Sequence, residues 1–161
     1  MSQRPKRVRP QAGEVFKISL DDDGLTAYAV ALKSPKFAVF DGRDVSDVEE
    51  ALKRHPMFYV SVMDRAVVSG RWPVVRMNPD AVPALKAPPT FIQDPINPEK
   101  FQIYEGGVMR PATRTECEPL ERTAVWDPEH VEDRIRDAYA GLENRWLRSL
   151  QIDAVWLKRQ P

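Results

Sequence analysis

The order of patterns along the chain predicts an α+β fold, with strands in the first two-thirds and helices in the last third. Short segments in which apolar and polar residues alternate indicate strands, and a late segment with apolar residues three and four apart indicates a helix. Strands joined by short connections favour antiparallel pairing. We therefore expect a twisted antiparallel sheet, open to partial closure into a barrel, with C-terminal helices packed on one face.

The first strands follow from alternation and turn chemistry. Phe16, Ile18 and Leu20 alternate with polar residues in segment 13–20, which predicts a half-buried strand. Short carboxylates and a glycine then form a turn. Two strands are expected after it, at 25–33 and 36–41, with a tight turn at Ser34-Pro35. Further strands are predicted at 58–62, at 72–75 on a sheet edge, at 101–104 and 108–110 as a hairpin, and at 120–126.

Capping signals predict the helices. Ser46 and Glu49 have the spacing of a capping box, so a short helix is expected there, ending before Pro56. A helical turn is predicted at 66–69. The strongest helix begins at Asp127 and ends before a glycine at position 141, and a shorter one spans roughly 143–150.

The segment from 78 to 98 carries six prolines and is predicted to be a loop. A loop this long in a compact domain indicates either a functional segment or a helix or strand that the sequence pattern does not reveal.

Charge and length suggest a single domain over residues 13–150, between tails at 1–12 and 151–161. The 161-residue chain has 24 basic and 24 acidic residues, and the first twelve residues hold four basic and no acidic ones. The rest is therefore acidic, with 20 basic against 24 acidic residues. No apolar segment follows the basic start, so we expect no signal peptide, no membrane span and a cytoplasmic location.

Known catalytic and metal motifs do not fit the chain. Two histidines and a single cysteine, Cys117, are too few for a closed zinc site, so no metal or cofactor is expected. Carboxylates flank Cys117 on both sides and would raise its pKa, the wrong direction for a nucleophile. The acidic run at 21–24 lacks the spacing of a calcium loop and indicates a turn.

Most of the acidic residues near the strongest helix have a structural interpretation as caps or solvated surface. Glu132 and Arg136 are spaced for an i,i+4 ion pair. A pair of converging catalytic acids, or His130 as a base, remains the alternative. The acids considered are Asp94, Asp127, Glu129, Glu132 and Asp133.

The tryptophans are expected mainly in the core. Trp72 stands beside Arg71 at the start of the proline-rich segment, and these residue types dominate protein–protein hot spots. A partner-binding role is therefore open for both.

Several segments, in order, resemble the immunity protein 26 family of bacterial polymorphic toxin systems. The resemblance runs from about Gly13 to Leu150, and Ser19 stands where that family's opening strand is expected to have proline. The segments are Gly13 to Leu20, Tyr28 to Leu32, Phe40-Asp41, Val62-Met63-Asp64, Ser69 to Val74, Phe91 to Pro95, Glu121-Arg122, Ala124-Val125-Trp126 and His130 to Arg134.

The resemblance implies a cytosolic antidote that binds and neutralises a toxin domain encoded beside it. The expected partner is therefore a protein, rather than a nucleic acid, a membrane or a small-molecule substrate, and an acidic body suits a basic one. The residues we select as partner-binding are Asp21, Asp22, Asp23, Arg71, Trp72, Asp94, Trp126 and His130.

Two alternatives remain open from the sequence. One is a nucleic-acid-binding module that uses the basic residues 1–12. The other is a small enzyme, which predicts a pocket holding two carboxylates or His130 beside a carboxylate.

Overall fold

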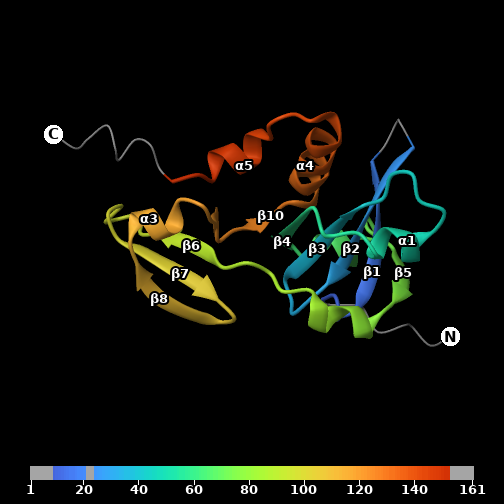
Figure 1. Ribbon diagram of the computed structural model, residues 1–161, viewed down its shortest axis with the longest axis horizontal. Helices are drawn as coiled ribbons and strands as arrows, with labels where there is room; N and C mark the ends of the chain where they lie inside the picture. Colours follow the sequence, from blue (N-terminus) through green and yellow to red (C-terminus); the bar gives the residue numbers. More distant parts are fainter. Residues whose placement is uncertain (1–8, 21–23, 153–161) are drawn as a thin grey trace. The chain divides into compact units, whose positions relative to one another are not determined.

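A computed structural model describes residues 9–20 and 24–152, and its described strands form two sheets (Figure 1). A six-stranded sheet has the order β10-β4-β3-β2-β1-β5, and a four-stranded sheet has the order β8-β7-β6-β9. The predicted α+β class is confirmed. The strands are shared between two sheets, and neither closes into a barrel over the described residues.

The chain divides into two compact units. The first unit comprises residues 1–87 and 125–136, and the second unit comprises residues 88–124 and 137–161. Residues 13–150, predicted as one domain, therefore contribute to both units.

The first unit is built on the six-stranded sheet. Neighbouring strands pair antiparallel, apart from β10, which lies parallel to β4. The edge position predicted from Pro73 is confirmed, because β5 pairs only with β1. The strands are β1 (Glu14–Leu20), β2 (Leu25–Ala31), β3 (Lys36–Asp41), β4 (Phe58–Val62), β5 (Val74–Met77) and β10 (Val125–Trp126).

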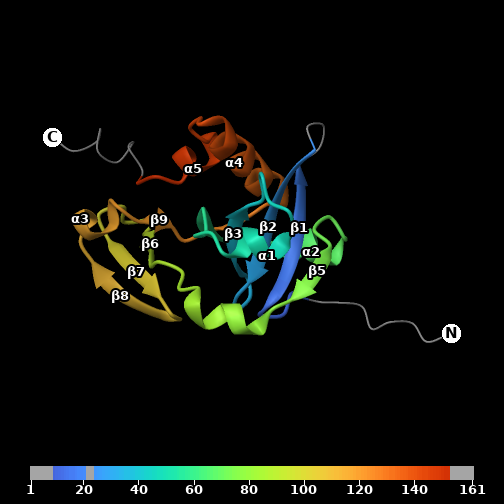
Figure 2. The same cartoon turned by 45° about the vertical axis from the view of Figure 1, so that its right-hand side comes forward.

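Both faces of this sheet are covered at its centre, and β3 is therefore apolar almost throughout. On one face Phe37 stacks edge-on against Phe16 and Trp72, with ring centroids 5.8 and 5.9 Å apart. The helix α1 (Val48–Leu52) covers the other face (Figure 2). Its Val48 and Leu52 pack against a cluster that includes Phe40. This explains why four consecutive residues of β3 are buried, where a half-covered strand would alternate.

The first helix has a different cap from the predicted one. Asp47, not Ser46, is the N-cap, and its carboxylate accepts the backbone N–H of Glu50 at 3.0 Å. The Glu50 carboxylate in turn accepts the N–H of Ser46 at 2.7 Å. Glu50 thus bonds the residue before the cap and not Asp47 itself, so the predicted capping box does not form.

The proline-rich segment is not one loop. It contains the 3-10 helix η2 (Pro79–Ala84) and the strand β6 (Thr90–Gln93). The 3-10 helix η2 was missed because it is irregular and contains prolines, which are typical of loops. The strand β6 was missed because only four residues separate Pro89 from the turn residues Asp94 and Pro95.

The second unit packs one face of its sheet against a small core of Phe91, Phe101, Ile103 and Cys117. The predicted hairpin is confirmed as β7 (Phe101–Glu105) and β8 (Val108–Ala112). The predicted strand at 120–126 is divided, because β9 (Glu121–Arg122) pairs with β6 whereas β10 pairs with β4.

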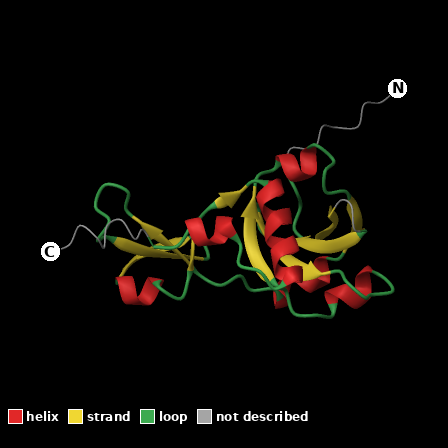
Figure 3. Cartoon of the chain, turned by 90° about the horizontal axis from the view of Figure 1, so that it is seen from above, coloured by secondary structure: helices red, strands yellow, loops and turns green. Residues whose placement is uncertain are grey.

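Helices complete the two units (Figure 3). The predicted turn at 66–69 is α2 (Arg65–Val68), and the strongest predicted helix is α4 (Pro128–Ala140), which belongs to the first unit up to Arg136. The second unit holds α5 (Arg145–Ser149) and α3 (Arg114–Cys117), which was not predicted. None of the helices in the described ranges is long and apolar enough to span a membrane.

Candidate functional site

A cluster of charged side chains in the first unit ties α4 to α2 and to the segment before β5. We call it the α4 cluster, and it consists of Arg65, Arg71, Trp72, Asp127, Glu129, His130 and Glu132. Gly70 has a φ of 80° and turns the chain after α2, and Arg71 and Trp72 follow it towards α4. Three of the residues selected from sequence therefore meet here.

Glu132 is the buried centre of the α4 cluster, with 3% of its surface exposed. Its carboxylate accepts the Nε and Nη2 protons of Arg71 at 2.7 and 2.8 Å, and the indole N–H of Trp72 at 3.0 Å. A bidentate arginine–carboxylate pair with the indole N–H as a third hydrogen-bond donor is strong, because it satisfies the buried negative charge.

The predicted Glu132–Arg136 pair is therefore wrong, because Arg136 binds Asp133 at 3.1 Å instead. Glu132 is not a solvated helix residue either, since it faces the core side of α4 together with Val131 and Ile135.

Arg65 crosses from α2 to the first turn of α4. Its guanidinium donates to Asp127 at 3.0 Å and to both oxygens of Glu129, at 2.5 and 2.9 Å. These bonds lower the pKa of Glu129 to about 2 and raise the pKa of Arg65. Both groups are therefore charged at neutral pH, and acids at a helix N-terminus also suit the helix dipole.

His130 lies beside a carboxylate, as the enzyme alternative predicted. Its Nδ1 is 3.6 Å from Asp127 Oδ2, and about a third of its side chain is exposed. This separation exceeds a hydrogen bond, and the other oxygen of Asp127 is held by Arg65. The arrangement is a histidine near a carboxylate rather than an aligned acid–base dyad.

The two selected tryptophans are buried. Trp72 is 1% exposed and Trp126 is 6% exposed. The Arg134 guanidinium lies 3.9 Å from the ring centre of Phe58 and 5.3 Å from that of Trp126. Both indoles therefore hold charged residues in place. Among the selected residues of this unit that the structure describes, Arg71 and His130 are the accessible ones.

Asp94 lies apart from these residues in sequence and belongs to the second unit, where it begins the loop between β6 and β7. Its Oδ1 accepts the backbone N–H groups of Ile96 and Asn97 at 2.8 and 2.9 Å, and these bonds lower its pKa. Asp21, Asp22 and Asp23 lie outside the described residues.

Sequence reasoning missed two features beside Asp94. Ile96 is 86% exposed, and a hollow of about 490 Å³ adjoins the loop. The signal available was Asp94-Pro95 followed by Asn97-Pro98, a pattern typical of a rigid turn.

Cys117 is fully buried, and burial followed by the charge of Glu116 raises its thiol pKa, in the predicted direction. Within the parts of the chain that the structure describes, no three His, Cys, Asp or Glu side chains are placed to hold a metal ion. Comparison of the chain with protein families, curated proteins and solved structures finds no match.

Proposed function

We propose that this protein is an immunity-type antidote that binds a cognate bacterial polymorphic toxin domain and neutralises it inside the producing cell. The observation that carries the proposal is the ordered set of segments resembling the immunity protein 26 family. Two of those segments, 69–74 and 130–134, meet in the α4 cluster through Arg71, Trp72 and Glu132. The resemblance therefore includes residues that bond one another and hold α4 to the segment before β5.

The physical chemistry of the α4 cluster suits recognition. Arg65 and Arg71 are 49% and 40% exposed, yet both are held by carboxylates. Side chains that are already ordered lose little entropy on binding, so a rigid charged surface favours a specific protein partner.

The test uses the toxin domain that the proposal expects to be encoded beside this gene. We expect its expression alone to stop growth, and coexpression of this chain to restore it. Purified protein and toxin domain should form a complex of one to one stoichiometry by light scattering. Growth arrest that persists in the presence of abundant folded antidote, with no complex, would contradict the proposal.

The enzyme alternative has the His130–Asp127 pair in its favour. Titration of toxin activity with this protein separates the two functions. A binding antidote reaches full inhibition only near equimolar amounts, whereas an enzyme that inactivates the toxin would act at far lower amounts. His130→Ala should leave the equimolar end point unchanged if the protein acts by binding.

A further inference from the structure

The loop between β6 and β7, residues 94–100, is held in one conformation by its own hydrogen bonds. Besides the two bonds to its Oδ1, Asp94 donates its N–H to the Lys100 carbonyl at 3.0 Å, and Lys100 donates to the Asn97 carbonyl at 2.9 Å. The Gln93 amide donates to the Pro98 carbonyl at 3.0 Å. Prolines at 95 and 98 further restrict the backbone.

Ile96 stands at the tip of this braced loop and is the most exposed large hydrophobic residue in the described ranges. A single exposed aliphatic residue is ordinary on a protein surface. Here the residue is held by a rigid support, so that little conformational entropy would be lost when a partner covers it.

The hollow next to the loop has apolar walls and a charged rim. Ile92, Phe101 and Pro111 line it, and its volume is about 490 Å³, enough for a long side chain. Asp94, Glu99 and Lys100 also line it. In the described part of the chain, Glu99 makes no ion pair or hydrogen bond, and neither does Asp94 Oδ2.

These charges specify the kind of side chain that fits. Two carboxylates against one ammonium group leave the rim net negative. Apolar walls suit the methylene stem of a basic side chain, and free carboxylate oxygens suit its head. Arginine is the best match because its planar guanidinium can bond two carboxylate oxygens at once.

We propose that the 94–100 loop and the adjoining hollow form a docking site for a protein surface that presents an arginine beside an apolar pocket. Ile96 enters the pocket, and the arginine enters the hollow between Asp94 and Glu99. The inference rests on the proposed function for the identity of the partner, the toxin domain, and not for the chemistry of the site.

The chemistry is tested without a toxin. In a titration of the isotopically labelled protein with acetyl-arginine amide at low salt, the backbone amide resonances of residues 92–102 should shift. Acetyl-citrulline amide has the same shape without the charge and should shift them much less. Asp94→Asn with Glu99→Gln should reduce the arginine-induced shifts by more than about half, because exposed ion pairs are worth a few-fold in affinity.

The double variant keeps the loop folded, because an asparagine side-chain oxygen still accepts both backbone N–H groups that Asp94 accepts. Glu105→Gln, on the same sheet but away from the hollow, is the matched control. Equal shifts with citrulline, or arginine-induced shifts unchanged in the double variant, would overturn the docking site.

The partner is tested with the toxin domain encoded beside this gene. Ile96→Ala should weaken its affinity about tenfold or more, as expected for removing a buried aliphatic anchor. Leu142→Ala, 64% exposed in the same unit, should change it little. If the wild type binds the toxin domain and Ile96→Ala binds it equally well, the docking site is wrong and the proposed function stands. If the wild type does not bind, the proposed function is wrong.

Discussion

The two units bury their sheets differently. The six-stranded sheet of the first unit is covered on both faces at its centre, where β3 has four consecutive buried apolar residues. The four-stranded sheet of the second unit has one core face, and β7 alternates between buried and accessible residues. The four most exposed large hydrophobic residues of the described chain, Ile96, Val108, Met109 and Leu142, all lie in the second unit.

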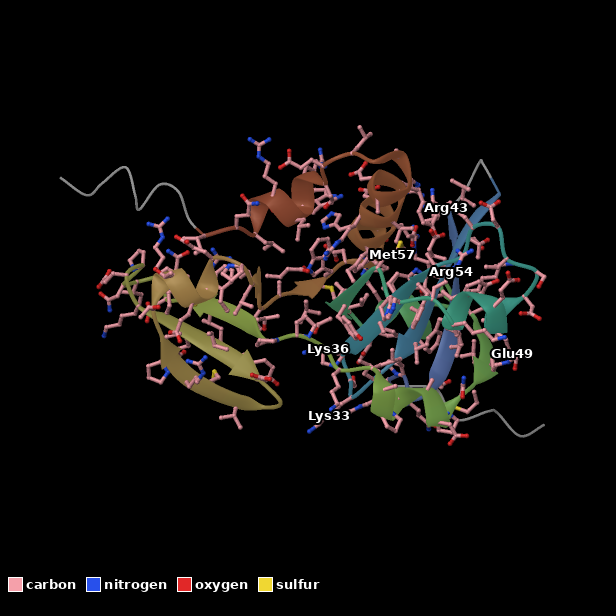
Figure 4. The ribbon with its side chains drawn as sticks, in the orientation of Figure 1. Lys33, Lys36, Arg43, Glu49, Arg54 and Met57 are labelled. Atoms are coloured by element: carbon pink, nitrogen blue, oxygen red, sulfur yellow. The ribbon has the colours of Figure 1, made fainter. Side chains whose placement is uncertain are left out.

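The polar interactions differ in the same way. In the first unit, Glu132 and its partners are 60 and 61 residues apart in sequence and join separate elements. In the second unit, Asp94 and Glu116 bond backbone N–H groups within three residues of themselves. The contacts of Glu132 thus join distant elements of the first unit, and those of Asp94 and Glu116 hold accessible loops of the second unit. Arg122 is the counterexample, because it links β9 to Gln93 and Leu150 within the second unit. The first unit also has a partly exposed charge cluster, in which Arg43 and Arg54 (both labelled in Figure 4) bind Asp41.

The largest expected effect comes from the aromatic core of the first unit. Phe37→Ala should lower the free energy of unfolding by about 3–5 kcal/mol, because Phe37 contacts both Phe16 and Trp72. Phe91→Ala in the second unit should cost less, since its small core lies beside the Arg122 guanidinium at 5.0 Å and can relax. Chemical denaturation measures both, and equal losses would contradict the comparison.

The next effect concerns the buried carboxylate. Glu132→Ala should cost about 2–3 kcal/mol, since it leaves Arg71 without its main partner and the Trp72 indole N–H unsatisfied. Asp133→Asn, one residue along the same helix, weakens a partly exposed ion pair with Arg136 and should cost at most about 0.5 kcal/mol. If thermal unfolding shows similar losses for the two variants, α4 is not held through Glu132.

Two glycines, one in each unit, differ in the space available for a side chain. A side chain on Gly13, whose φ is 93°, would come within 2.7 Å of the Pro79 backbone, whereas nothing lies within 4 Å of one on Gly106, whose φ is 58°. Gly13→Ala should therefore cost about 2–3 kcal/mol and Gly106→Ala about 1 kcal/mol. Urea midpoints of the two variants check the ranking, which a larger loss at Gly106 would reverse.

The smallest effect is a dependence on pH. The pKa of Glu129 is about 2 in the folded protein against 4.5 for an unperturbed glutamate, mainly because of the Arg65 hydrogen bonds. Its contribution to stability is therefore complete above about pH 4.5 and is lost as pH falls towards 2. The difference in urea midpoint between wild type and Glu129→Gln should shrink over this range. A difference that stays constant down to pH 2 would show that the ion pair is not responsible.

Much of the fold was predictable because its signals are local. Alternation in segment 13–20 and the proline at the start of α4 specify a strand and a helix without reference to distant residues. The helix α3 was missed although Thr113 and Glu116 form a capping box that the sequence displays. The sequence therefore contains the signal for α3.

The candidate site was less predictable. Arg71, Asp94 and His130 could be selected as polar or hot-spot residue types, but their partners could not. Glu132 sits among the acids of an amphipathic helix, and the sequence alone assigns it to solvent. Its burial depends on Arg71 and Trp72, about sixty residues earlier.

The sequence by itself determined the α+β class, most of the strands and the position of α4, because periodicity and capping act within a few residues. Only the tertiary structure decided that the strands form two sheets, and that residues 121–122 and 125–126 join different ones. It also decided that Glu132 is buried and that Ile96 stands exposed beside a hollow. Strand pairing and side-chain burial are stabilised by contacts between residues far apart in the chain, and a local sequence pattern does not specify those contacts.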